Sequence, residues 1–104
     1  MKYRKYDLYW AEVKFEYSNE IKKRPVVIIN QTTAAIISLK VTSVGRGDTI
    51  DEMPITDWKE AGLAKASYIR LSKMIRLIES DMREKIGTLT FKDIKRLDLR
   101  IASR

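Results

Sequence analysis

Hydrophobic and polar positions along most of the chain follow the patterns of β-strands. Residues 6–15 place apolar side chains at nearly alternate positions, and one irregularity near Ala11 predicts a bulge. The run 26–30 is continuous, apolar and β-branched, which predicts a strand buried on both faces. The polar segment 16–23 and the glycine-flanked segment 45–48 are predicted loops. Three further strands are predicted at residues 34–44, 66–78 and 85–89, the second of them either continuous or bent.

The apolar spacing changes to that of a helix near the end of the sequence. Thr90 is a favourable N-cap, and Asp93 three residues later forms a weaker version of a capping box. The apolar positions that follow recur at helical spacing and predict one buried stripe, formed by Phe91, Ile94, Leu97 and Ile101. A shorter helical turn is predicted at residues 56–62, and Gly62 would end it.

These elements predict one domain, residues 1–104, that is mostly β with a short helical turn and a C-terminal helix. A chain of 104 residues has the size of a single domain. No apolar stretch is long enough to cross a bilayer, and no apolar secretory segment follows the basic start. The chain contains no cysteine, which excludes disulfides and zinc–cysteine sites and fits the reducing cytoplasm, where we expect the protein.

The charge balance indicates a polyanionic partner. Lys and Arg number 21 against 14 Asp and Glu, and the net charge is +7. Nucleic acid or an acidic protein would fit this excess, and a basic surface that only maintains solubility is the alternative. The chain also contains no histidine, which excludes a Ser-His-Asp triad. Any catalysis must therefore use Arg, Lys, Tyr, Ser, Thr or carboxylate groups.

A basic cluster precedes the apolar run 26–30. It consists of Lys22, Lys23 and Arg24, and Pro25 follows directly. Because proline restricts the neighbouring backbone, the guanidinium of Arg24 is held as a planar, bidentate donor that suits a phosphate. A surface arginine beside a strand start is an equally acceptable interpretation of these residues alone.

Hydroxyl side chains occur where the next predicted strand ends. Lys40, Thr42 and Ser43 lie there, and Arg46 follows between two glycines. Hydroxyl groups beside an arginine can hydrogen-bond a phosphodiester. Threonine is also common in strands, and Gly-Arg-Gly is an ordinary turn, so a structural role fits this segment as well.

Aromatic and acidic residues carry weaker signals. Exposed aromatic rings can stack on the bases of a single strand, but most are expected in the core or at an interface, Trp10 and Phe91 in particular. Asp48, Asp51 and Glu52 cluster without a second group at metal-ligand spacing. The sequence therefore predicts no metal site and no cofactor.

Several short motifs follow one another in a recognisable order. They are residues 24–29 (RPVVII), 41–43 (VTS), 61–63 (AGL), 67–71 (SYIRL) and 85–90 (KIGTLT). In order and spacing they resemble the PemK/MazF family of type II toxin–antitoxin toxins, from about Asp7 to Leu97. The chain departs from that family in residues 16–21, which lack the usual Gly- and Gln-containing run. It also has Lys40 where many members have proline, which adds a phosphate contact.

The resemblance implies an SH3-like β-barrel that forms a homodimer and acts as a metal-independent, sequence-specific endoribonuclease, an mRNA interferase of the hydrolase class. Its catalytic arginine and threonine correspond to Arg24 and Thr42. The substrate would be single-stranded RNA, and an acidic antitoxin would block the RNA groove. Because the 2′-hydroxyl of RNA supplies the nucleophile, we expect 2′,3′-cyclic phosphate and 5′-hydroxyl ends. The residues expected to contact the RNA backbone are Lys22, Lys23, Lys40, Ser43 and Arg46.

Two other functions fit the same sequence. A toxin of the same fold could poison DNA gyrase, since a fold does not fix a function. A non-catalytic module that binds RNA or DNA would also explain the charge and the aromatic residues. Replacing Arg24 separates the first from a nuclease, and a cleavage assay separates the second.

Overall fold

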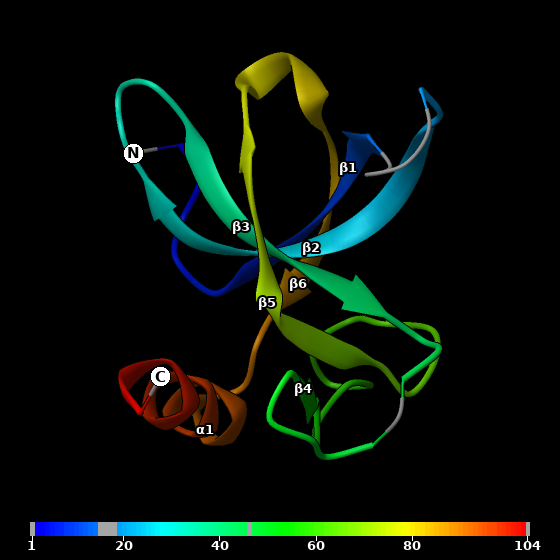
Figure 1. Ribbon diagram of the computed structural model, residues 1–104, viewed down its shortest axis with the longest axis vertical. Coiled ribbons are helices and arrows are strands. Elements are labelled where there is room, and N and C mark those ends of the chain that lie inside the picture. Colours follow the sequence, from blue (N-terminus) through cyan, green and yellow to red (C-terminus); the bar gives the residue numbers. More distant parts are fainter. Residues whose placement is uncertain (1, 15–18, 46, 104) are drawn as a thin grey trace.

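The computed structural model describes residues 2–14, 19–45 and 47–103, which fold into a strongly curved antiparallel sheet and a helix (Figure 1). The strand order is β4-β5-β3-β2-β1-β6. Among the described residues no ladder joins the outer strands β4 and β6, so the sheet is open rather than a closed barrel. The predicted mostly-β class with a C-terminal helix is confirmed. The elements are β1 (Asp7–Lys14), β2 (Ile21–Gln31), β3 (Ile36–Thr42), β4 (Glu52–Pro54), β5 (Tyr68–Leu77), the 3-10 turn η1 (Glu79–Asp81), β6 (Met82–Thr88) and α1 (Phe91–Ala102).

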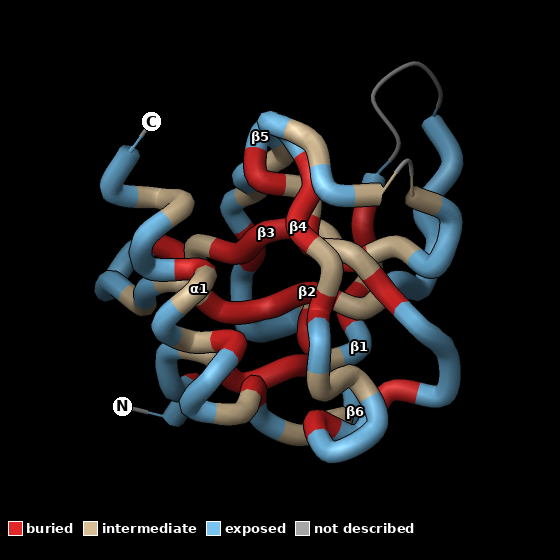
Figure 2. The backbone as a smooth tube through the Cα atoms, turned by 90° about the horizontal axis from the view of Figure 1, so that it is seen from below, coloured by how far each residue is buried: buried red, intermediate tan, exposed pale blue. Residues whose placement is uncertain are grey.

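Strand β2 is buried on both faces, as its continuous apolar run predicts. Val27 packs in a cluster between the sheet and α1 that includes Leu97. Val26 and Ile28 point the other way, into a second cluster that includes Tyr3. Buried positions accordingly run along β2 and β3 through the middle of the molecule (Figure 2). The two clusters fix the register of β2, and with it the residues on either side of the apolar run.

Two residues expected in the core are not there. Phe91 is 73% exposed. It precedes the fully buried Asp93 by two residues, or about 200° around a helix, and therefore faces away from the sheet. Trp10 is 36% exposed, because its neighbour Ala11 faces a core cluster and side chains alternate along a strand. Both core predictions were wrong, although the rest of the helical stripe is buried or partly buried around Leu97.

Pairing between strands moves several element boundaries. The predicted loop at 16–23 is too long, because β2 begins at Ile21 and pairs Lys22 and Lys23 with β1. Hydrogen bonds to the neighbouring strand hold this charged segment extended. The short strand β4 was not predicted, since three residues are too few to show a pattern. The bulge near Ala11 is confirmed by register shifts between β1 and β6 on either side of Tyr9.

The helix begins where the sequence predicts, but its capping box does not form. Thr90 is the N-cap residue, and its hydroxyl donates to Asp57 Oδ2 at 2.7 Å instead of capping α1. The carboxylate of Asp93 accepts the backbone N–H groups of Thr56 (3.0 Å) and Asp57 (2.8 Å). Asp93 therefore caps the turn at 56–62, and Gly62 ends that turn with φ +101° as expected. Within the described residues, no helix has the length and apolar composition needed to cross a membrane.

Candidate functional site

An open cavity of about 1070 Å³ lies where β1, β2, β3 and β5 meet the segment after the turn at 56–62. Four of the residues proposed from the sequence line it: Arg24, Lys40, Thr42 and Ser43. Lys22 and Lys23 belong to β2, the same strand as Arg24, but do not line the cavity. Arg46 lies outside the described residues. The two separate sequence segments around Arg24 and Thr42 are thus brought to one place.

The pairing of β2 with β3 explains how this happens. Val26 pairs with Lys40 in an antiparallel ladder. Continuing that register by two residues places Arg24 opposite Thr42, and directly opposed side chains in an antiparallel pair share one face. On its other side Arg24 pairs with Ala11 of β1. An exposed arginine is therefore carried by a strand that has a partner on each side.

The hydroxyl group of Thr42 is held by a local turn. Its Oγ1 accepts the backbone N–H of Val44 at 3.1 Å and lies 3.4 Å from the carbonyl oxygen of Val44, to which it donates. The longer of these two bonds is the weaker, so the hydroxyl hydrogen can turn towards a phosphoryl oxygen while the N–H bond keeps the side chain in place.

The cavity is strongly cationic. Among the described residues that line it, five are lysine or arginine and none is aspartate or glutamate. Such a surface concentrates anions and raises their rate of association. The sequence did not single out three of these cations as site residues, because their positions depend on how β5 pairs with β3 and on the path of the segment before β5. They are Lys65, Arg70 and Lys73.

Lys23 connects β2 to β6 and to the Trp10 ring beside the cavity. Its ammonium donates to Glu84 Oε2 at 2.7 Å and lies 5.6 Å from the centre of the Trp10 ring. The hydrogen bond from Lys23 lowers the pKa of Glu84 below its ordinary value of 4.5. Lys22 lies 3.6 Å from Glu20 in an exposed ion pair. These contacts give Lys23 a structural role, and contact of either lysine with RNA stays a prediction.

Trp10 contributes an aromatic surface to the cavity that the core prediction overlooked. Its ring lines the cavity and lies beside Lys23. Its apolar area makes the site suitable for a ligand with flat rings as well as phosphates. A nucleic acid single strand has both.

The wall at Gly62 is held by close backbone packing. A Cβ atom on Gly62 would lie 2.5 Å from the carbonyl oxygen of Ile86, and one on Gly87 would collide with the carbonyl oxygen of Ala61. Only glycine allows β6 and the turn to approach in this way. This close contact fixes the position of Gly62, from which the cavity wall continues with Leu63 and Ala64.

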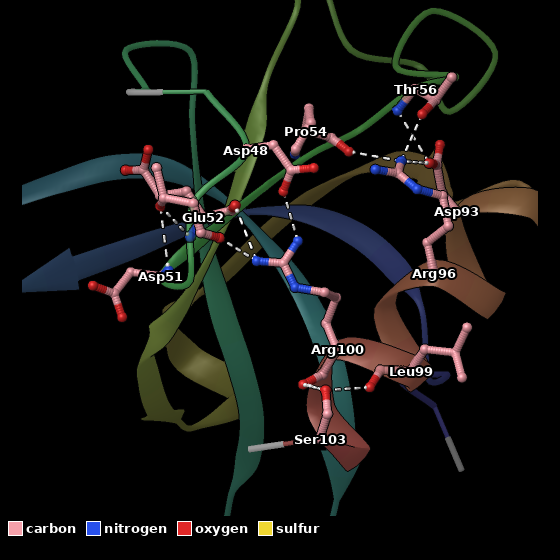
Figure 3. Close-up of polar contacts among 11 residues, drawn as sticks. Asp48, Asp51, Glu52, Pro54, Thr56, Asp93, Arg96, Leu99, Arg100 and Ser103 are labelled. Atoms are coloured by element: carbon pink, nitrogen blue, oxygen red, sulfur yellow. Dashed lines mark hydrogen bonds and ion pairs between the residues drawn. The ribbon is translucent and has the colours of Figure 1, made fainter.

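Helix α1 anchors the segment that leads into this wall (Figure 3). Arg96 Nη1 donates to the carbonyl oxygen of Pro54 (3.0 Å), to Thr56 Oγ1 (2.5 Å) and to Asp93 Oδ1 (3.0 Å). Arg100 donates to Asp48 Oδ1 at 2.8 Å and to the carbonyl oxygen of Thr49. Arg100 thus holds the acidic loop at Asp48 and Thr49. Arg96 holds the segment that follows it, at Pro54 and Thr56. Within the described residues, no three carboxylates gather where they could hold a metal ion.

Comparisons with solved structures show the same fold. One similar structure is an endoribonuclease in complex with its cognate antitoxin from Mycobacterial species, with 13% identity and a TM-score of 0.73 over 95% of this chain and 90% of that one. Another is the Mycobacterium tuberculosis toxin MazF-mt6, with 20% identity and a TM-score of 0.73 over 93% of each chain. An Mtb toxin is 21% identical, with a TM-score of 0.67 over 77% of this chain and 90% of that one.

Among curated proteins no match is found. The sequence profile of a toxin family, however, matches residues 4–103, nearly the whole chain. On this match, the chain belongs to the PemK-like, MazF-like toxin family of type II toxin–antitoxin systems.

Proposed function

We propose that the protein is an endoribonuclease toxin that cuts single-stranded RNA at short sequences without a metal ion. One observation carries this proposal: Arg24 and Thr42 line the same cavity, whose charged lining among the described residues is entirely cationic. An arginine and a hydroxyl group are what a site needs when the substrate brings its own nucleophile.

In the proposed reaction, the 2′-hydroxyl oxygen attacks the adjacent phosphorus atom and the bond from phosphorus to O5′ breaks. The 2′-hydroxyl loses a proton and O5′ gains one, so the step is balanced without an oxidant, a reductant or water. The products are a 2′,3′-cyclic phosphate and a 5′-hydroxyl. Arg24 neutralises the charge that develops on the phosphoryl oxygens, and Thr42 donates to one of them.

The remaining residues would guide the RNA strand. Lys40 and Ser43 line the cavity beside Thr42 and would contact the flanking backbone. Lys22 and Lys23 would act from β2 beside the cavity. Arg46 is also proposed to contact the RNA, on its sequence position after Ser43 alone. Contacts of this kind make binding depend on salt, because each phosphate that is neutralised releases a counterion.

The expected partners are an acidic antitoxin and a second copy of the chain. A similar structure contains a toxin together with its cognate antitoxin, and an acidic segment would complement the cationic cavity. The homodimer is proposed on family membership. The absence of cysteine agrees with action in the cytoplasm, where the RNA substrate is found.

The test is incubation of the purified protein with several long single-stranded RNAs in EDTA. Discrete fragments with 5′-hydroxyl ends are expected. Arg24→Ala should lose activity by about 100-fold or more. Arg76→Ala is the matched control, since Arg76 is exposed on β5 outside the cavity.

Each result has a different meaning. No cleavage of any RNA would overturn the ribonuclease, and toxicity without cleavage would favour a gyrase poison. Cleavage by Arg24→Ala at the wild-type rate would overturn the role of Arg24 alone. Cleavage that EDTA abolishes and magnesium restores would contradict metal independence.

A further inference from the structure

Strand β5 departs from regular pairing beside the cavity. Leu39 of β3 pairs with Met74, but Val41, two residues later, pairs with Ile69. A single β3 residue, Lys40, therefore faces the four β5 residues 70–73, three more than regular pairing would give. Extra residues of this kind form a bulge, and bulges redirect side chains next to functional sites.

The bulge places two cations on one face. Arg70 and Lys73 are three residues apart, so in an uninterrupted strand they would point to opposite faces. Both nevertheless line the cavity, as does Lys40 across from them. The bulge thus gathers three positive charges from two strands at one edge of the cavity.

Arg70 forms an ion pair with a carboxylate of the neighbouring strand β4. Its Nε atom lies 3.6 Å from Glu52 Oε2, and the Glu52 side chain is only 8% exposed. Glu52 pairs with Arg70 across β4 and β5 and does not line the cavity. The ion pair favours conformations of Arg70 near Glu52 before the ligand arrives, which reduces the conformational freedom lost on binding.

The two β5 members of this cluster, Arg70 and Lys73, are separated from Arg24 by one strand. β2 and β5 lie on opposite sides of β3, and neighbouring strands are about 4.8 Å apart, so their backbones are roughly 10 Å apart. This separation suits two phosphates along a strand better than one phosphate shared by both groups.

We propose that Lys40, Arg70 and Lys73 form a second phosphate site, which binds a phosphate of the RNA strand other than the one that is cut. The site rests on the proposed function for the identity of the ligand. It would fix how the strand lies across β3, with the scissile phosphate at Arg24 and Thr42 and a neighbouring phosphate over the bulge of β5.

The first experiment measures binding without cleavage. The protein of residues 1–104 is titrated into a fluorescent single-stranded 2′-O-methyl RNA oligonucleotide, which lacks the nucleophile. Fluorescence anisotropy gives the affinity at several salt concentrations. Lys73→Gln should reduce the slope of log affinity against log salt by about 0.7, the value for one phosphate contact on a single strand. Lys92→Gln, an exposed lysine of α1 outside the cavity, should leave the slope unchanged.

Arg70→Lys provides a second variant that keeps a positive charge beside Glu52, so loss of the fold does not confuse the result. It should weaken binding because an ammonium cannot make the two parallel bonds of a guanidinium. Circular dichroism and the urea midpoint check that Arg70→Lys and Lys73→Gln remain folded.

A second measurement locates the phosphate. Neutral methylphosphonate groups replace one phosphate at a time around the sequence that the protein cuts. The wild type should lose affinity at the scissile linkage and at one other linkage. Lys73→Gln should lose sensitivity only at the second. A single sensitive linkage in the wild type would overturn the second site.

The outcomes separate this proposal from the function on which it rests. Binding that depends on Lys73 in a protein that cuts no RNA would support the phosphate site and reject the ribonuclease. If the wild type cuts RNA and Lys73→Gln and Lys92→Gln have equal salt slopes, the ribonuclease is supported and the second phosphate site is rejected. Failure to bind any single strand would overturn both.

Discussion

The buried carboxylate of Asp93 in α1 accepts the backbone N–H of Asp57 at 2.8 Å. It also accepts the N–H of Thr56, and Arg96 balances its charge. A helix residue therefore orients the turn at 56–62, which ends at the cavity wall. The proposed catalytic residues lie on β2 and β3, whereas the cavity wall depends on contacts with α1.

Asp93→Ala should destabilise the protein by about 3 kcal/mol, because it removes a buried acceptor and leaves two N–H groups and Arg96 without this partner. The urea midpoint measures the change. Glu60→Ala, at an exposed position of the turn at 56–62, should change the stability by less than about 0.5 kcal/mol. Equal effects of the two substitutions would contradict the role of Asp93.

Gly62→Ala and Gly47→Ala separate backbone strain from collision. Both glycines have positive φ, +101° and +97°, but a Cβ at Gly47 meets no atom within 4 Å. Gly47→Ala should therefore cost about 1 kcal/mol, and Gly62→Ala clearly more, because Ile86 must move. Thermal unfolding measures both. A smaller loss of stability for Gly62→Ala than for Gly47→Ala would contradict the close packing of Gly62 against β6.

Thr42→Val should reduce RNA cleavage by about 100-fold, as expected when a donor to the developing charge is removed. Thr32→Val is a matched control, because the Thr32 hydroxyl also closes a local turn, with the N–H groups of Ala34 and Ala35. Both variants should lose about 1 kcal/mol of stability. Similar cleavage by the two variants would remove Thr42 from the mechanism.

Tyr6 should make stability fall at high pH. Burial, together with a 2.6 Å hydrogen bond from its hydroxyl to Asp98, raises its pKa above the ordinary value of 10.0. The folded state therefore holds this proton more tightly than the unfolded state. The stabilisation is complete below about pH 10 and disappears as the pH rises through the raised pKa.

Urea unfolding of the wild type and Tyr6→Phe between about pH 9 and pH 11 tests this dependence. The stability difference between the two proteins should shrink at the alkaline end. An ultraviolet titration should find one tyrosine with a raised pKa that Tyr6→Phe lacks. A constant difference across the range would contradict the assignment.

The sequence predicted the elements best where burial imposes a period. The run around Val27 and the helix around Leu97 are buried as expected, because side-chain spacing alone reveals which face meets the core. Phe91 was assigned to the wrong face because apolar spacing does not show that Asp93 takes the inward position. Asp93 can be buried because its carboxylate accepts hydrogen bonds from Thr56 and Asp57, which are distant in the sequence.

The site was only partly predictable for a related reason. Arg24 and Thr42 occur in recognisable local motifs, and strand pairing then brought them to one cavity. Arg70 and Lys73 became visible only through the β5 bulge, which depends on the partner strand. Local sequence shows what a strand contains, whereas pairing decides what it faces.

The contacts of Asp93 and Arg96 with the turn at 56–62 also bear on the order of synthesis. Helix α1 follows every strand of the sheet along the chain, so the ribosome releases it after them. Until then, the segment at 48–57 lacks the helix groups that hold it. The cavity wall is therefore completed last, so the groove proposed to bind RNA would be unfinished in a chain still emerging from the ribosome.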